Sequence, residues 1–282
     1  MPTIFVTGAT GNQGGAVAHH LLKHGFHVKA LTRNPDSAEA KKLNALKAEV
    51  VKGDLEDHAS FRSHLAGIDG IFNVQTFKIT VDREIKQGMG MASLAKEYNV
   101  PHYVYSSVAG ADLNTGIPHF ESKLKIENHI KQLGLPYTII RPASLLENHL
   151  IPDVHKRILK GKLVSPVNKK AIQQFVASAD VGRLATEIFS NKEKYNTQTI
   201  SIASEQLDLE QMAGIFSEAM GREIKYQHLP MLITRLLMGK DLHTMFKWLN
   251  ANNGIFIKDM TAFREEYPDM MSVKEWVSLN FK

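Results

Sequence analysis

The segment Val6-Thr7-Gly8-Ala9-Thr10-Gly11-Asn12-Gln13-Gly14-Gly15 has the residue types and spacing that suit the binding of a pyrophosphate. Its glycines recur every three residues, directly after an apolar run and at the start of a helical pattern. Glycine permits a positive φ and close approach of the backbone to a phosphate, and the unpaired amides of a helix N-terminus favour the same anion. A glycine-rich turn at this position in a strand–turn–helix unit predicts a dinucleotide site rather than a turn that only packs helix on strand. The candidate contacts are Gly8, Thr10, Gly11, Asn12, Gln13 and Gly14.

Arg33 follows the second apolar run and bears on which dinucleotide is bound. A site that prefers NAD usually places Asp or Glu here, where it binds the ribose 2′-hydroxyl. The segment Leu31-Thr32-Arg33-Asn34-Pro35 contains no carboxylate, and an arginine can bind a 2′-phosphate through two parallel hydrogen bonds. We therefore expect NADP(H) to be preferred over NAD(H), although Arg33 could also be a solvated surface residue.

Further candidate contacts follow the third and fourth apolar runs, because ligands of parallel α/β sheets bind outside the carboxyl ends of the strands. Asp54 and Leu55 follow the third run, at the turn expected to contact the adenine. Asn73 and Gln75 are at the end of the fourth, where the chain lines the cofactor cleft. Either pair could also be ordinary turn chemistry.

The elements that must position these residues alternate along the first 150 residues. Short apolar runs rich in valine, isoleucine and tyrosine are typical of strands buried on both faces of a parallel sheet, and longer amphipathic segments separate them. This alternation predicts a Rossmann-type, doubly wound parallel α/β sheet. In the helix expected over 83–98, Ile85, Met89, Leu94 and Tyr98 fall close to one stripe. The predicted strands are Thr3–Thr7, His27–Thr32, Ala48–Lys52, Gly70–Val74, His102–Ser106 and Tyr137–Arg141, and the predicted helices are Gly14–His24, Ala38–Leu46, Ser60–Leu65, Arg83–Tyr98 and Phe120–Leu133.

After Pro142 the pattern loosens, which predicts two domains. We expect residues 1–148 to form a dinucleotide-binding Rossmann domain and residues 149–282 to form a smaller α/β lobe interleaved with it, with the ligand in the cleft between them. Within the lobe we expect a helix capped by Asp208 and closed by Gly221, and a longer helix interrupted near Gly239. The expected elements are helices Val181–Ser190, Leu209–Gly221 and Leu232–Asn250, and strands Thr199–Ala203 and Glu223–Leu229.

The composition of the 282 residues excludes several classes of site. There are no cysteines, so disulfides, thiolate nucleophiles and iron–sulfur clusters are ruled out. His19, His20 and His24 lack a nearby carboxylate at helical spacing, so we expect no metal site. The net charge of +5 is mild, which predicts no specific binding of nucleic acid. Neither a secretory signal nor an apolar run of about 18 residues is found, so we expect a cytoplasmic protein without a membrane span.

Several further motifs accompany the glycine-rich turn, and they are Thr32-Arg33-Asn34-Pro35, Gly53-Asp54, Tyr105-Ser106-Ser107, His119-Phe120-Glu121-Ser122-Lys123 with Glu127, Arg141-Pro142 with Glu147-Asn148, and Asp180-Val181-Gly182. Together with the turn they cover about residues 3–190, two thirds of the chain. In these motifs the sequence resembles the NmrA-like family, an atypical branch of the short-chain dehydrogenase/reductase superfamily.

The resemblance also implies roles for residues near the middle of the chain. Active members of the superfamily carry a Tyr four residues before a Lys, and the phenol exchanges a proton with the substrate carbonyl. Lys123 matches that Lys, for which the resemblance implies the role of a ligand of the nicotinamide ribose, but His119 stands where the Tyr would be. Imidazole titrates near neutral pH, so His119 could be the acid, or it could simply face the cleft. Ser106 or Ser107 would orient the substrate, with Ser107 the catalytic candidate and Ser106 beside the cofactor.

Three functions are compatible with these residues. The first is a sensor in which NADP(H) changes the affinity for a regulatory protein partner, and the second is an NADPH-dependent reductase of quinones or related small carbonyls. The third, a sugar-nucleotide epimerase or dehydratase of the extended short-chain dehydrogenase type, depends on the Tyr that is absent. The substrate, the partner and the oligomeric state do not follow from the sequence.

Overall fold

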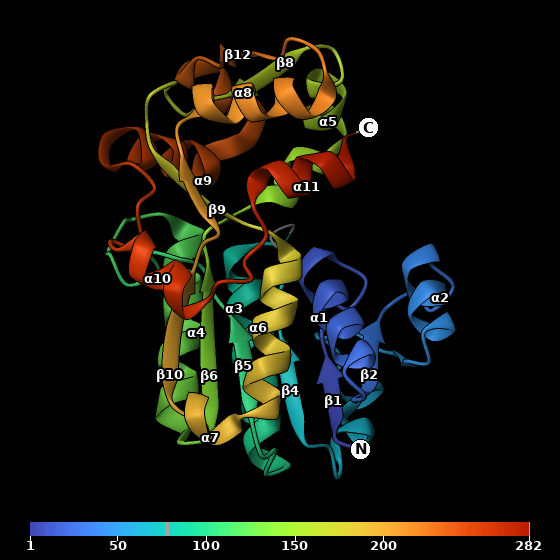
Figure 1. The fold of residues 1–282 in the computed structure, drawn as a ribbon. Coiled ribbons are helices and arrows are strands. Elements are labelled where there is room, and N and C mark those ends of the chain that lie inside the picture. The colour runs from blue at the N-terminus through green and yellow to red at the C-terminus, as the bar shows by residue number, and fades with distance from the viewer. Residues whose placement is uncertain (77–78, 282) are drawn as a thin grey trace. The chain divides into compact units, whose positions relative to one another are not determined.

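The computed structural model describes residues 1–76 and 79–281. Seven strands form one sheet in the order β10-β6-β5-β4-β1-β2-β3 (Figure 1). The five neighbouring pairs from β6 to β3 are all parallel, which confirms the Rossmann-type α/β prediction. The strand order reverses between β1 and β4, and such a reversal opens the crevice in which ligands of these sheets bind. The strands are β1 (Thr3–Val6), β2 (His27–Thr32), β3 (Glu49–Lys52), β4 (Gly70–Asn73), β5 (Tyr103–Ser106), β6 (Tyr137–Pro142) and β10 (Gln198–Ile202).

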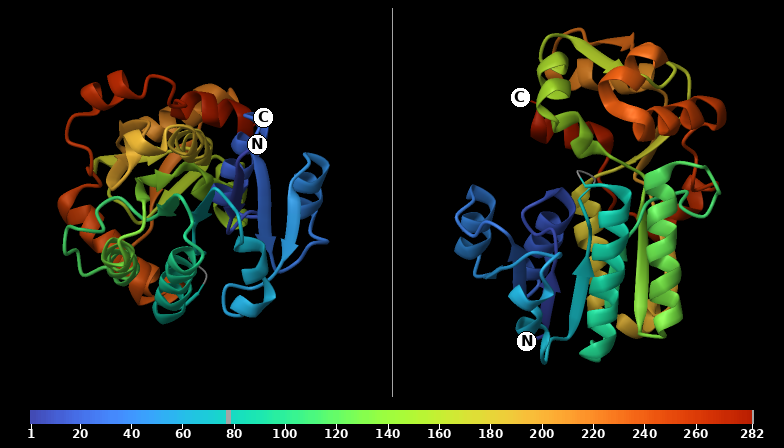
Figure 2. Two further views of the ribbon diagram at one scale, coloured as in Figure 1. Left: turned by 90° about the horizontal axis from the view of Figure 1, so that it is seen from below. Right: turned by 180° about the vertical axis from the view of Figure 1, so that it is seen from behind.

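Helices cover both faces of this sheet, as the front and rear views show (Figures 1 and 2). One face carries α1 (Asn12–Lys23) and α6 (Ser178–Ser190), and the opposite face carries α3 (Val81–Glu97) and α4 (Pro118–Leu133). The short helix α2 (Ala38–Ala45) connects β2 to β3.

The helix predicted over 60–65 is wrong. The chain there forms two 3₁₀ helices, η1 (His58–Ser60) and η2 (Arg62–Leu65), separated by Phe61 with φ −142°. Phe61 is fully buried and its ring stacks on Phe5 with centroids 5.8 Å apart. Burial of this ring holds the backbone outside the helical region and divides the segment.

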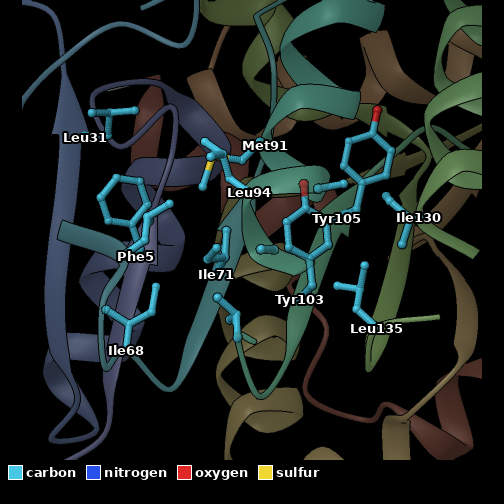
Figure 3. Close-up of a cluster of buried hydrophobic side chains, with 14 of the residues drawn as sticks. Phe5, Leu31, Ile68, Ile71, Met91, Leu94, Tyr103, Tyr105, Ile130 and Leu135 are labelled. Carbon is cyan, nitrogen blue, oxygen red and sulfur yellow. The ribbon is translucent and has the colours of Figure 1, made fainter. Parts of the chain in front are cut away.

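A continuous apolar core lies between the sheet and the helices α3 and α4. Figure 3 shows Met91 and Leu94 of α3 above Ile71 of the sheet and Ile130 of α4 beside Tyr105, all members of one buried cluster. Of the stripe expected on α3, Leu94 lies in this cluster and Met89 and Tyr98 pack against it, whereas Ile85 is only partly buried and is not part of it. The buried face of α3 consists of Glu84, Gln87, Gly88, Met91, Ala92, Leu94 and Ala95.

The chain forms two compact units and passes between them several times. The first contains Met1–Asp112, His119–Arg141 and Val181–Ile200, and the second contains Leu113–Pro118, Pro142–Asp180 and Ser201–Lys282. Most of α6 and the start of β10 thus belong with the main sheet, although the sequence pattern placed them in the C-terminal lobe. The reason is that β10 hydrogen-bonds to β6 at the edge of the sheet.

The second unit contains short strands, most of which the sequence pattern did not predict. Strand β9 (Gln173–Val176) pairs with β7 (Ser144–Leu145) and β11 (Glu205–Leu207), while β8 (Lys162–Ser165) pairs with β12 (Lys225–His228). The other helices of the described chain are η3 (Leu146–Leu150), α5 (Pro152–Ile158), α7 (Lys192–Tyr195), α8 (Leu209–Met220), α9 (Met231–Asn252), α10 (Met260–Glu266) and α11 (Val273–Asn280).

Two local predictions in this unit are confirmed. Asp208 caps α8 in a capping box with Gln211, and Gly221 closes the same helix with φ 61°. Helix α9 is interrupted at Gly239, whose φ of 80° lies outside the helical region. Within residues 1–76 and 79–281, we find no helix whose length and hydropathy would allow it to cross a membrane.

Candidate functional site

The glycines of the turn between β1 and α1 have different structural roles. Gly8 has φ 60°, as a left-handed turn requires. Gly14 is buried where α1 passes the turn, and a Cβ there would lie 2.3 Å from the Gly8 carbonyl oxygen. Gly11 is the N-cap of α1 with φ −100° and Gly14 is helical, so neither uses the positive φ that glycine permits. Only Gly8 needs left-handed backbone, while Gly14 permits close packing.

The N-terminus of α1 carries no acidic residue and no side-chain cap. Amides of the first helical turn have no partner within the helix and, with the helix dipole, form a local anion site. Asn12 is exposed at this end and Thr10 is half-buried. Gln13 is held in place because the Ser106 hydroxyl donates to its Oε1 at 2.6 Å. This bond ties the start of α1 to the end of β5.

A buried hydrogen-bond network links β1 to β4, where the strand order reverses. The Thr7 hydroxyl donates to Asn73 Oδ1 at 2.9 Å and accepts from the Val74 amide at 2.9 Å. Asn73 Nδ2 donates to the Tyr103 hydroxyl at 2.7 Å. Burial raises the pKa of Tyr103, and the bond from Asn73 offsets part of that effect. The network fixes the position of the glycine turn relative to the end of β4.

Gln75 extends this network at the carboxyl edge of the sheet. Its Nε2 donates to Asn73 Oδ1 at 2.8 Å, while its buried Oε1 has no hydrogen-bond partner among residues 1–76 and 79–281. Only 6% of Gln75 is exposed, and a buried acceptor without a donor is costly. A ligand that supplied an N–H or O–H here would remove that cost.

The other candidates at the strand ends differ in how they are held. Arg33 is exposed and has no ion-pair or hydrogen-bond partner within the described part of the chain. Asp54 stabilises its own turn, because its Oδ1 accepts from the Glu56 amide at 3.0 Å. Leu55 packs against the core cluster. The structure thus provides a free cation after β2 and a structured turn after β3.

Lys123 forms a mostly buried ion pair that the sequence analysis did not foresee. Its Nζ lies 2.9 Å from Oε1 of Glu84 on α3, with 13% and 6% of the two side chains exposed. The Ser122 hydroxyl donates to the other oxygen of Glu84. The ring of Tyr105, labelled in Figure 3, lies 5.7 Å from Nζ. Burial, followed by the charge of Glu84, raises the pKa of Tyr105 well above its usual value.

Ser107 is hydrogen-bonded to a second buried carboxylate. Its hydroxyl donates to Glu127 Oε1 at 2.5 Å, and Glu127 also pairs with Arg141, whose Nη2 lies 2.6 Å from Oε2. Arg141 Nη1 lies 2.5 Å from Asp112 Oδ2. Burial would lower the pKa of Arg141, but its bonds to Glu127 and Asp112 outweigh this effect and raise it. Both Ser107 and Lys123 therefore contact carboxylates.

His119 lies in the first turn of α4 and is half-buried. Its ring meets that of Phe120 nearly edge-on, with centroids 4.9 Å apart. The sequence did carry a signal for the missed Glu84, since this residue is in helical register with Gly88, Met91 and Ala95 on the buried face of α3. A carboxylate on an apolar face requires a buried cation or donors. Within the ranges 1–76 and 79–281, no group of three potential metal ligands is found.

The family model and the curated relatives that match this chain both point to the same protein family. Residues 1–277 match the model of the NmrA-like family. An NmrA-like family domain-containing protein of Dictyostelium discoideum is 28% identical, covering 96% of this chain and 98% of its own.

Solved structures that share the fold include the following two. The NADPH-dependent quinone oxidoreductase of Escherichia coli, complexed with NADPH, has a TM-score of 0.81 at 22% identity, covering 99% of this chain and 100% of its own. The negative transcriptional regulator NmrA, in complex with NADP, has a TM-score of 0.78 at 21% identity, covering 99% and 95%. The match to the family model spans nearly the whole sequence, and the chain belongs to the NmrA-like family.

Proposed function

We propose that this protein binds NADP(H) and reduces acceptors that need no proton from the enzyme during hydride transfer, with quinones as the acceptor class. The observation that carries the proposal is the pairing of Ser107 with Glu127 and of Lys123 with Glu84. These contacts engage both groups that would otherwise assist a carbonyl reduction.

Several features of the β1–α1 turn support dinucleotide binding. The N-terminus of α1 lacks an acidic residue, Gly8 supplies the turn, and Gly14 allows the helix to approach the strand. A pyrophosphate at this end would accept hydrogen bonds from the free amides. The buried Oε1 of Gln75 accepts no hydrogen bond from the described residues, and ribose hydroxyls and the nicotinamide carboxamide both offer a donor for it.

The charges around this turn favour the phosphorylated dinucleotide. Arg33 has no partner among the described residues and follows β2, so it is available for a 2′-phosphate. We expect NADPH to bind about tenfold or more tightly than NADH, because a charge-assisted bidentate contact contributes about 1.5–3 kcal/mol.

Arg33→Ala should abolish this selectivity, because it should lower the affinity for NADPH about tenfold or more and leave the affinity for NADH unchanged. Calorimetric titration with both dinucleotides measures it. Arg33→Lys is the matched control, and it should retain part of the preference because it keeps the charge but not the planar fork. Equal affinities of the unaltered protein for NADPH and NADH would contradict the assignment of Arg33.

The proton donors available at the site limit the class of hydride acceptor that the protein could reduce. Bound NADPH would supply a hydride, and a quinone that accepts it becomes a hydroquinone anion that takes its proton afterwards from solvent or from His119. An unactivated ketone would need a proton as the hydride arrives, and the tuned phenol that usually supplies it is replaced by His119. Lys123 is proposed as the ligand of the nicotinamide ribose.

NADPH oxidation with a benzoquinone and with a simple ketone tests this proposal. We expect turnover with the quinone and little with the ketone. His119→Ala should lower quinone turnover less than about tenfold, below the ~10²–10⁴-fold contribution of a positioned acid, with unchanged NADPH affinity. Efficient ketone reduction, or a larger loss in His119→Ala, would show that a proton relay operates.

A cofactor sensor is the second candidate, favoured by the same engaged Ser107 and Lys123. NmrA, one of the neighbours in fold, is described as a negative transcriptional regulator. A sensor must bind NADPH and NADP⁺ with different affinities, since only differential binding shifts a conformational equilibrium. NADPH binding without turnover on any quinone would favour the sensor over the reductase.

A further inference from the structure

The ion pair between Glu84 and Lys123 joins two helices on the same face of the sheet. Glu84 lies near the start of α3 and Lys123 near the start of α4, and their side chains are 6% and 13% exposed. A buried carboxylate is expensive unless it is paired and hydrogen-bonded. Glu84 meets both conditions, because Lys123 Nζ lies at 2.9 Å from Oε1 and the Ser122 hydroxyl donates to Oε2.

The surroundings limit what Lys123 can do. Tyr105 on β5 presents its ring face 5.7 Å from Nζ. On α4 itself, the titratable residues one turn away are His119 and Glu127, and Glu127 pairs with Arg141. Glu84 is thus the carboxylate that balances the charge of Lys123.

We propose that Glu84 is a positioning residue that holds the Lys123 ammonium in place to bind the nicotinamide ribose. This inference rests on the proposed function, in which Lys123 is the ribose ligand. A lysine has three N–H donors on a long flexible stem. Glu84 takes one donor and fixes the stem, which leaves donors for ribose hydroxyls and lowers the ordering cost of binding. The balanced charge also makes Lys123 an anchor rather than a group that acidifies a neighbour.

A double-mutant cycle on dinucleotide affinity tests this role in the full chain. The proteins are wild type, Glu84→Gln, Lys123→Met and Glu84→Gln/Lys123→Met, each titrated with NADPH and NADH by calorimetry. We expect Lys123→Met and Glu84→Gln each to weaken binding about tenfold, the factor that corresponds to one net hydrogen bond to a charged group. The double variant should bind no more weakly than Lys123→Met alone, because Glu84 acts through Lys123.

Two further readouts separate positioning from a general structural effect. Glu84→Gln should weaken the binding of NADPH and of NADH by the same factor, since both dinucleotides contain the nicotinamide ribose. It should also raise the KM for NADPH without changing the KM for the quinone. Glu97→Gln is the matched control: it removes a glutamate from the other end of α3, where the exposed carboxylate pairs with Arg62, and should leave affinity unchanged.

Glu84→Asp gives the conservative comparison. Introduced into the wild-type protein, it should lower the affinity for the dinucleotide a few-fold, and introduced into the Lys123→Met variant, it should not change that affinity. It replaces Glu84→Gln throughout the cycle if that variant does not fold. An equal loss from the Glu84 substitution with and without Lys123 would overturn the inference while leaving the proposed function intact. Failure of the wild type to bind either dinucleotide would instead overturn the proposed function.

Discussion

Arg141→Met is expected to lower the free energy of unfolding by about 3–5 kcal/mol, the usual cost of removing one partner from a buried ion pair. Arg141 pairs with Glu127 through Nε at 2.9 Å and Nη2 at 2.6 Å, and the Glu127 side chain has no exposed surface. After the substitution Glu127 would keep the Ser107 hydroxyl, but that single donor does not balance its charge. Lys131 lies 3.9 Å away and is 39% exposed, so its compensation is weak.

Denaturant unfolding of the variants measures this effect. Arg141→Met/Glu127→Gln should recover much of the lost stability, because the amide keeps an acceptor for Ser107 and removes the buried charge. Asp112→Asn is the control on the exposed side of the network, where 54% of the Asp112 side chain meets solvent. It should cost less than about 1 kcal/mol. Wild-type stability in Arg141→Met would contradict the assignment of a buried pair.

Gly14→Ala is expected to destabilise the protein by about 2–3 kcal/mol, because overpacking outweighs the better helix propensity of alanine. The new Cβ would lie 2.3 Å from the Gly8 carbonyl oxygen and 2.6 Å from that of Thr7. Both neighbours are backbone atoms, so neither can move aside by a change of rotamer. Either α1 shifts away from β1 or the turn between them opens, and since we propose that this turn holds the pyrophosphate, we expect weaker NADPH binding as well.

Thermal unfolding and NADPH titration measure the two effects, with an expected fall in Tm of roughly 5–10 °C. Gly214→Ala is the matched control, since Gly214 lies within α8 and a Cβ there meets no atom within 4 Å. It should stabilise by about 0.4–1 kcal/mol. Gly11→Ala, whose Cβ would lie 3.3 Å from the Gly8 oxygen, should fold normally. A Gly14→Ala protein with unchanged Tm would show that the turn tolerates a side chain.

The sequence alone was sufficient to predict the strands and most helices of the main sheet. Strands buried on both faces, helical periodicity and capping residues are local properties, so the bounds of β2 and the caps of α8 could be predicted correctly. The segment over 60–65 was not predicted correctly, because burial of Phe61 against Phe5 overrides a weak helical pattern. The short strands of the second unit carry too few residues for periodicity to identify.

The glycine-rich turn was predictable as a motif, but the role of each glycine was not. Spacing alone treats Gly8, Gly11 and Gly14 alike, whereas the backbone gives only Gly8 a positive φ. The requirement at Gly14 comes from atoms of Thr7 and Gly8 across the turn. The sequence shows the positions of the glycines, whereas the backbone conformation at Gly8 and the packing around Gly14 show why glycine is required there.

The partners of the candidate catalytic side chains depended entirely on the tertiary structure. The sequence identified Lys123 and Ser107, and the helical register of Glu84 indicated a carboxylate that needs a cation or donor, but it did not indicate that Lys123 contacts Glu84 or that Ser107 contacts Glu127. Lys123 and Glu84 come from different helices, and they meet because β4, β5 and β6 are adjacent in the sheet and place α3 beside α4. The periodicity of apolar residues indicates which face of a helix is buried. Which residue neutralises a buried charge on that face depends on the neighbouring helix, and therefore on the strand order, which no local sequence pattern encodes.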